Sequence, residues 1–125
     1  MRTVIIIGSG PAGYIVYQPN GRMMVFAVAD KSIRPRGPSD DAARLRLYNT
    51  LLGYAGTYTV QGQTVTHHIE VSENQANTGS DFVRIWSLNG KVLNLRTAPR
   101  KAAGPGAVPG DNREIVNTLT WEKVD

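Results

Sequence analysis

Two side chains in the middle of the sequence, His67 and Arg84, could combine acid–base chemistry with the binding of an oxyanion. An imidazole takes up or releases a proton near neutral pH, whereas a guanidinium keeps its positive charge and can hold a negatively charged oxygen. A tyrosine hydroxyl such as that of Tyr58 can donate a hydrogen bond to the same oxygen. Whether these groups meet depends on the strands that carry them, because successive side chains of a strand face opposite sides.

Arg84 lies in the later of two hairpins whose turns are clear in the sequence. Asn89-Gly90 is a strong two-residue turn signal between strands expected at 81–88 and 91–97. Residues that pair across a hairpin share a face, and the more apolar face should point inward. That face carries Arg84 together with Phe82, Trp86, Leu88, Leu93 and Leu95.

His67 lies in the earlier hairpin, whose turn we expect at Gln61-Gly62 between strands at 54–60 and 63–72. Pairing across this turn sets Tyr58 opposite Val65 and Gly56 opposite His67. His68, the next residue, then faces outward. The inner face should carry Tyr54, Tyr58, Val65, His67, Ile69 and Val71.

The expected interior is apolar with a few converging polar groups, which is typical of a small-molecule site. We predict that His67, Arg84 and Tyr58 are catalytic: His67 moves a proton, and the other two stabilise an oxyanion. A structural role for His67 and Arg84, as hydrogen-bonded residues near one end of a barrel, is the alternative. The ligand-binding residues should be Tyr17, Tyr54, Phe82, Trp86, Val65, Ile69 and Leu95.

An inward-facing Arg84 needs a partner, since an unpaired buried guanidinium is costly. We expect tyrosine hydroxyls, water or Asp30 to hold it in the empty protein. The natural ligand should then bring a carboxylate, enolate or carbonyl oxygen to Arg84.

The segment Gly8 to Gly13, GSGPAG, matches the GxGxxG pattern of dinucleotide-binding turns. That pattern binds a pyrophosphate only when a helix follows it inside a βαβ unit. Here two β-rich runs follow, and they flank the hairpin signal Pro19-Asn20-Gly21. We therefore expect a strand connection, no FAD or NAD, and no other cofactor. A metal site is not expected either, because the chain has no cysteine and its two histidines face opposite sides.

The whole chain of 125 residues has the size of one domain, 1–125. A short helix should begin after Ser39 as its N-cap and stop at Gly53, with Leu45, Tyr48 and Leu52 on its apolar side. The fold class we predict is all-β: an eight-stranded antiparallel up-and-down barrel with this helix between the third and fourth strands. A sandwich is the alternative. The strands should span 2–7, 13–18, 22–29, 54–60, 63–72, 81–88, 91–97 and 115–124.

Charge and hydropathy restrict the partners. Fourteen basic and ten acidic residues give a net charge of +4, but the basic residues are scattered and no aromatic stacking motif accompanies them. We expect no nucleic-acid partner, and a basic surface that binds nucleic acid or protein is the weaker hypothesis.

The apolar N-terminal run is too short for a signal peptide or a membrane span, so we expect a cytoplasmic protein without membrane contact. The Pro/Gly-rich stretch 98–114 should form a loop.

Four segments follow one another along the chain: GYIVYQPNGRMMV, YAGTYTVQGQTVTHHIEVS, TGSDFVRIWSLNGKVLNLRT and LTWEKV. In this order they resemble the bacterial and fungal lipocalin-like domain proteins of the calycin type. The resemblance covers residues 11–124, and it places Tyr17, Tyr54, Tyr58, His67 and Arg84 on characteristic positions. It departs from the family at the first strand, where MRTVIII replaces a Gly-Thr-Trp strand.

This resemblance implies a barrel around a small cavity, and related calycin barrels include both carriers and natural-product cyclases or isomerases. We expect an enzyme without a cofactor that acts on a small hydrophobic molecule bearing a carboxylate or carbonyl. A non-catalytic carrier of such a molecule is the alternative, because both functions need the same pocket. A homodimer is compatible with either.

Overall fold

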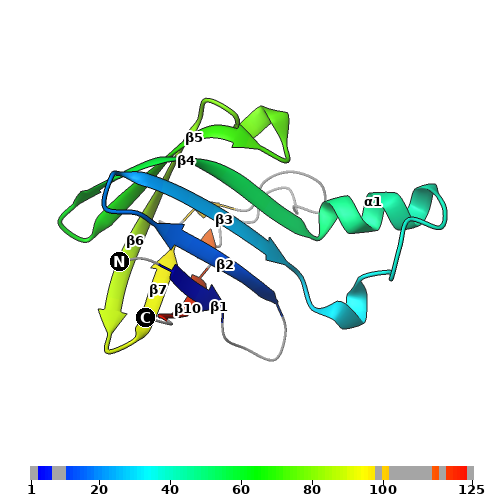
Figure 1. Cartoon of the computed structure of the whole chain (residues 1–125), viewed down its shortest axis with the longest axis horizontal. Coiled ribbons are helices and arrows are strands. Elements are labelled where there is room, and N and C mark those ends of the chain that lie inside the picture. The colour runs from blue at the N-terminus through cyan, green and yellow to red at the C-terminus, as the bar shows by residue number, and fades with distance from the viewer. Residues whose placement is uncertain (1–2, 7–10, 98–99, 102–113, 116–117, 124–125) are drawn as a thin grey trace.

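The computed structural model of the chain describes residues 3–6, 11–97, 100–101, 114–115 and 118–123 (Figure 1). Its helices are the 3-10 turns η1 (Lys31–Ile33) and η2 (Gln75–Asn77) and the α-helix α1 (Asp41–Asn49). The strands are β1 (Thr3–Ile6), β2 (Ala12–Tyr17), β3 (Arg22–Val28), β4 (Leu51–Gln61), β5 (Thr64–Ser72), β6 (Asp81–Asn89), β7 (Val92–Arg96), β8 (Arg100–Lys101), β9 (Glu114–Ile115) and β10 (Thr118–Lys123).

An antiparallel sheet closes into a barrel with the strand order β1–β10–β7–β6–β5–β4–β3–β2. Neighbours in the barrel follow one another along the chain, except that the separate β8–β9 pair comes between β7 and β10. The helix α1 lies between β3 and β4. The predicted all-β antiparallel barrel with one short helix is thus confirmed for the described residues.

Side chains alternate strictly along the strands that face the interior. On β3, Met23, Val25 and Ala27 are buried, whereas Met24 and Phe26 between them are exposed. This period of two buries one face of each strand and drives the sheet to close around it. The resulting core contains Ile15, Tyr17, Met23, Val25, Ala27, Tyr54, Val65, Ile69, Leu93, Leu95 and Trp121.

Both predicted hairpins form, but their turns lie one residue later than expected. Thr64 pairs with Gln61 and Val92 pairs with Asn89, so the turns are Gly62-Gln63 and Gly90-Lys91. Gly62 and Gly90 have positive φ angles of 59° and 61°, which a glycine adopts without strain. Each pairing therefore shifts by two residues, and a shift of two leaves every side chain on its predicted face.

A β-bulge overturns the predicted inward position of Val71. Gly56 pairs with Ile69 and Ala55 pairs with Val71, so Glu70 is an extra residue without a partner. One extra residue reverses the alternation beyond it. Ile69 accordingly lies in the core, whereas Val71 is 61% exposed.

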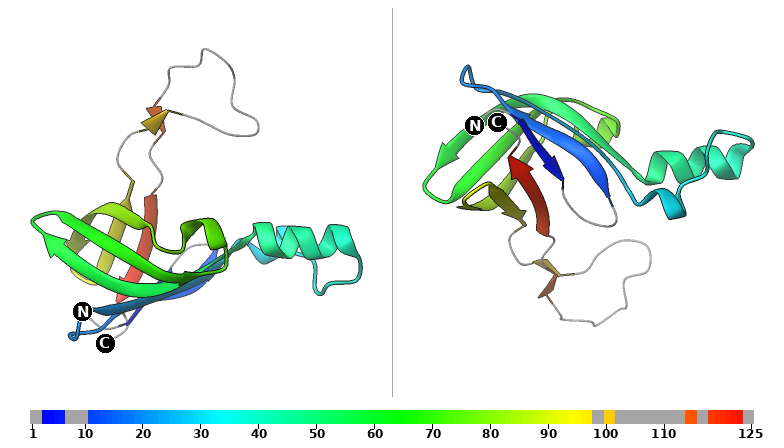
Figure 2. Two further views of the ribbon diagram at one scale, coloured as in Figure 1. Left: turned by 90° about the horizontal axis from the view of Figure 1, so that it is seen from above. Right: turned by 60° about the horizontal axis from the view of Figure 1, so that its bottom comes forward.

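The helix differs from the prediction at both ends and on its apolar side. Asp40, not Ser39, is the N-cap, because its carboxylate accepts a hydrogen bond from the backbone N–H of Ala43. The helix ends at Asn49, and the leucines that follow begin β4 because Leu51 and Leu52 pair with β3. Figure 2 shows α1 projecting away from the barrel, and it buries no residue.

The region that matches GxGxxG leads into a strand and not into a helix. Ala12 and Gly13 are the first residues of β2 and pair with β3. Residues 8–10 of the match lie outside the described residues, as do 98–99 and 102–113 of the stretch expected to be a loop. Within that stretch, Arg100–Lys101 pairs with Glu114–Ile115.

None of the helices in the described ranges has the length and apolarity needed to span a bilayer.

The bulge leaves no room for a side chain at Gly56. A Cβ atom there would overlap the backbone carbonyl oxygen of His68. We predict that Gly56→Ala destabilises the fold by about 3 kcal/mol or more, since the backbone of β5 must move. Gly37→Ala is the control, because a Cβ at Gly37 meets nothing within 4 Å. Urea unfolding measures both, and equal stability of the two variants would contradict this register.

Candidate functional site

A buried histidine between two tyrosine hydroxyls forms the centre of the barrel interior. The side chain of His67 on β5 is 1% exposed. Its Nε2 lies 2.5 Å from the hydroxyl oxygen of Tyr17 on β2, and its Nδ1 lies 2.7 Å from that of Tyr54 on β4. Three strands that are distant in sequence thus supply one hydrogen-bonded chain, which we call the Tyr17–His67–Tyr54 chain.

The imidazole of His67 is neutral. Burial lowers the pKa of His67 to about 4, and the positive charge of Arg84 lowers it further. Both tyrosines are protonated as well, because burial raises the pKa of Tyr54 to about 12 and that of Tyr17 above its usual range. At neutral pH the Tyr17–His67–Tyr54 chain consequently contains one imidazole proton and two phenolic protons.

The Tyr17–His67–Tyr54 chain has three protons for two hydrogen bonds, so one phenolic O–H is left over. Among the described residues, the buried Tyr54 hydroxyl has His67 Nδ1 as its hydrogen-bond partner. Tyr17 lines a cavity in which a ligand can accept its proton, whereas Tyr54 does not line that cavity, so we assign the proton of Tyr54 to Nδ1. His67 then carries its own proton on Nε2 and donates it to the oxygen of Tyr17. The O–H of Tyr17 is left free to donate elsewhere.

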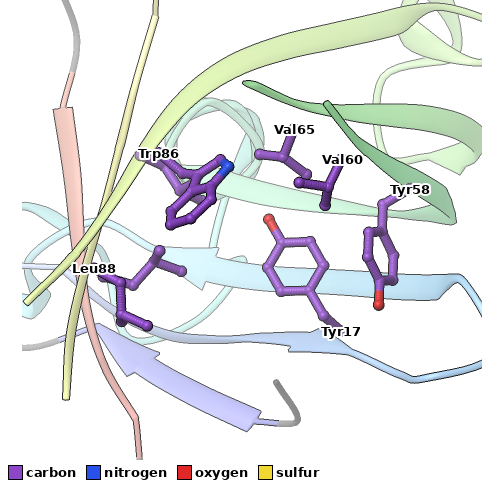
Figure 3. Close-up of a pocket in the computed structure, with 8 residues that line it drawn as sticks. Tyr17, Tyr58, Val60, Val65, Trp86 and Leu88 are labelled. Atoms are coloured by element: carbon purple, nitrogen blue, oxygen red, sulfur yellow. The ribbon is translucent and has the colours of Figure 1, made fainter. Parts of the chain in front are cut away.

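An apolar cavity of about 270 Å³ lies against Tyr17. In Figure 3 the Tyr17 hydroxyl points between Val65 and Trp86, which both line this cavity. The cavity lies toward the end of the barrel that has the turns Gly62-Gln63 and Gly90-Lys91. Its lining comprises Tyr17, Tyr58, Val60, Val65, Trp86, Leu88, Leu93 and Leu95.

The other polar groups of the lining already have partners. The Tyr58 hydroxyl donates to the backbone carbonyl of Gln18 at 2.7 Å, and it points away from the cavity (Figure 3). The indole N–H of Trp86 donates to the carbonyl of Gly62 at 3.1 Å. Tyr17 therefore provides the free hydrogen-bond donor among the side chains that line the cavity.

Among the described residues, Arg84 is hydrogen-bonded neither to a tyrosine hydroxyl nor to Asp30. Its Nη1 donates to the carbonyl of Val83 at 3.1 Å, and its guanidinium carbon lies 5.0 Å from the centre of the Phe82 ring. Asp30 instead accepts a hydrogen bond from the backbone N–H of Ser32 and caps η1. The sequence places Asp30 at a strand end but does not show that its carboxylate is used by its own turn.

The structure brings together part of the predicted site. Tyr17, Tyr58, Val65, Trp86 and Leu95 line the cavity, whereas His67 reaches it only through Tyr17. Four further predicted residues do not line it: Tyr54, Phe82, Ile69 and Arg84. Sequence reasoning did not name Val60, Leu88 and Leu93 as ligand-binding residues, although alternation along their strands puts them on the inner face.

A second hydrogen-bonded series lies on the outer face around His68. Its Nδ1 is 2.9 Å from a carboxylate oxygen of Asp81, and its Nε2 is 3.0 Å from the hydroxyl of Thr59. The residue types follow the order of a hydrolase triad, but Thr59 lies mid-strand, and its backbone pairs with Thr66. A strand that pairs in this way offers no oxyanion hole, so we assign this group a structural role.

Comparison with protein families identifies the fold. The sequence profile described as a lipocalin-like domain matches residues 2–124. The chain belongs to this lipocalin-like domain family. A search of the curated proteins finds no significant match. The family assignment covers the barrel and the cavity described above, and it confirms the resemblance recognised in the sequence.

The neutral His67 predicts how the lipocalin-like domain responds to acid. Its pKa is about 4 when folded, below its ordinary value of 6.5, so the unfolded chain binds a proton first as the pH falls. The free energy of unfolding therefore keeps its full value above about pH 6.5 and falls as the pH drops toward 4. Between pH 7 and pH 5 the loss is about 2 kcal/mol.

Urea unfolding at several pH values measures this loss. We predict that His67→Gln removes about 2 kcal/mol of the pH dependence between pH 7 and pH 5. His68→Gln is the matched control at the neighbouring, partly exposed position, and the loss that comes from the burial of His67 should persist in it. Identical pH profiles for all three chains would show that His67 is not held neutral.

Proposed function

We propose that this lipocalin-like domain binds a small apolar molecule that carries a hydrogen-bond acceptor oxygen. The observation that carries the proposal is the position of the Tyr17 hydroxyl at an otherwise apolar cavity of about 270 Å³, and we assign the O–H of Tyr17 as the donor to the ligand. Apolar walls with one or two placed polar groups are typical of sites that orient small ligands. A carbonyl oxygen fits this donor, and the cavity is smaller than the usual site of a drug-sized ligand.

We further propose that the bound molecule is isomerised or cyclised without a cofactor. A solvent water takes the proton from the carbon next to the carbonyl, and a hydrogen bond from Tyr17 to the carbonyl oxygen stabilises the negative charge of the enolate that forms. His67 supports this step through Tyr17, so it is a positioning residue and does not touch the substrate. Burial raises the pKa of Tyr17 above its usual range, which keeps the hydroxyl protonated as a donor, and the positive charge of Arg84 offsets only part of that rise.

A carrier function is the second candidate, and the composition of the cavity favours it. Seven of the eight lining residues contribute apolar surface or hydroxyl and indole groups that are already satisfied. None of the described residues that line the cavity has a charged side chain, so the lining offers no evident base. The two functions differ in whether bound molecules exchange protons, which can be measured directly.

Binding can be tested with two bicyclic probes of the same outline, 2-tetralone and tetralin, of which only the first carries a carbonyl. We predict that both quench the fluorescence of Trp86, because this indole lines the cavity. Tyr17→Phe should weaken the binding of 2-tetralone about fivefold and leave that of tetralin within about twofold, since it removes one hydrogen bond.

Tyr58→Phe is the matched control, because it removes a hydroxyl of the same lining that points to Gln18. It should leave the affinity for both probes nearly unchanged. Absence of binding by either probe would contradict the proposed site. Equal weakening of both probes in Tyr17→Phe would show that Tyr17 contributes shape and not a hydrogen bond.

Catalysis can be tested with the same ketone in deuterated water. Enolisation removes a proton from the carbon next to the carbonyl, and reversal adds a deuteron, which proton NMR detects. We predict that the chain accelerates this exchange over buffer and that Tyr17→Phe loses most of the acceleration, because the enolate oxygen loses its donor. Tight binding of 2-tetralone without acceleration would favour the carrier.

A further inference from the structure

We infer that the outer face of β2 to β5 is an interface on which a second copy of this chain docks. This face, called the β2–β5 face here, carries large apolar side chains that stay more than half exposed in the single chain. Contiguous exposed apolar surface on a folded domain marks interaction sites. The face consists of Tyr14, Val16, Met24, Phe26, Ala55 and Val71.

The strand register makes this surface continuous. Val16 pairs with Met24, Met24 with Ala55, and Ala55 with Val71, so one apolar row crosses four strands. A second row runs beside it, in which Tyr14 pairs with Phe26 and Phe26 with Gly53. The bulge at Glu70 completes the first row, because it turns Val71 outward.

The rows enclose a groove between their side chains. A hollow of about 470 Å³ is lined by Val16, Met24, Ala55 and Val71, and a second one of about 350 Å³ lies beside Met24 and Phe26. Protruding Met and Phe side chains next to such hollows allow two copies of the face to interdigitate. Packing of this kind is what distinguishes the centre of a stable interface.

The charges at the rim of the groove favour a second copy over other partners. Arg22 and Glu70 both line the larger hollow, and neither side chain forms an ion pair within the described part of the chain. In a two-fold interface each patch contacts itself, so Arg22 of one copy can meet Glu70 of the other. An anionic membrane surface would instead select a rim of one sign, and Glu70 would oppose it.

The closed sheet restricts how two copies can associate. Each barrel strand pairs on both sides, so association through a free strand edge is excluded for these strands. The copies must therefore pack face to face through side chains. A standard interface takes about 800 Å² from each partner, which is roughly a tenth of the 8357 Å² of surface on this chain.

Sedimentation equilibrium of the full chain tests this inference. The unmodified chain should reach twice the monomer mass, and Met24→Asp should raise the dissociation constant about tenfold or more. Val83→Asp is the matched control, because Val83 is 52% exposed on the outer face of β6, away from the interface. It should dimerise like the unmodified chain, and circular dichroism confirms that both variants are folded.

A charge exchange tests the two-fold arrangement itself. Arg22→Glu and Glu70→Arg should each weaken the dimer because like charges then meet, and the double variant should restore it. A chain that stays monomeric at all concentrations would overturn the inference. So would a monomer that co-sediments with phosphatidylcholine–phosphatidylglycerol vesicles, which would assign the face to a membrane surface, or a dimer that Met24→Asp leaves unchanged.

Discussion

The interior of this barrel depends on a neutral imidazole that bridges two buried hydroxyls. His67, Tyr17 and Tyr54 come from three different strands, and each satisfies a polar atom of another. Removing one member would leave buried polar groups without partners, which costs more than the hydrogen bond itself contributes. Ring contacts hold the geometry: Tyr17 packs edge-on against Tyr58 at 4.9 Å, and Tyr54 against Phe82 at 5.5 Å.

This constraint gives the cavity its polarity. Because the Tyr54 hydroxyl donates to Nδ1 of His67, the imidazole donates from Nε2 to the oxygen of Tyr17. The Tyr17 hydroxyl then donates toward the cavity. The second group that could have supplied a charge, Arg84, stacks over Phe82 instead. The ligand that we propose therefore carries a neutral acceptor oxygen and not a carboxylate.

Alternation along the strands was enough to predict much of this arrangement. The inward position of His67 and the outward position of His68 follow from parity, which the two-residue shift of both hairpins does not alter. The bulge at Glu70 could not be predicted, since an extra residue leaves no mark on the alternation until the partner strand is known. The helix is shorter than predicted, because Leu51 and Leu52 fit a helical stripe as well as a strand, and pairing with β3 decides between them.

The partners of single side chains were the least predictable part, because they depend on distances that alternation does not give. Parity shows that Arg84 and Tyr58 lie on inner faces, but not that the Tyr58 hydroxyl reaches the carbonyl of Gln18. The same strands also present two unlike faces. Met23 and Val25 fill the core while Met24 and Phe26 stay exposed beside them, so one strand contributes both to the cavity walls and to the β2–β5 face.

The protonation of the His67 ring tests this account most directly. Nitrogen NMR of the chain labelled with ¹⁵N in histidine distinguishes a nitrogen that carries a proton from one that does not. At pH 6 we predict a neutral His67 with its proton on Nε2 and a bare Nδ1, because Tyr54 donates to Nδ1. A His67 protonated on both nitrogens, or one with its proton on Nδ1, would contradict the assignment of Tyr17 as the donor of the cavity.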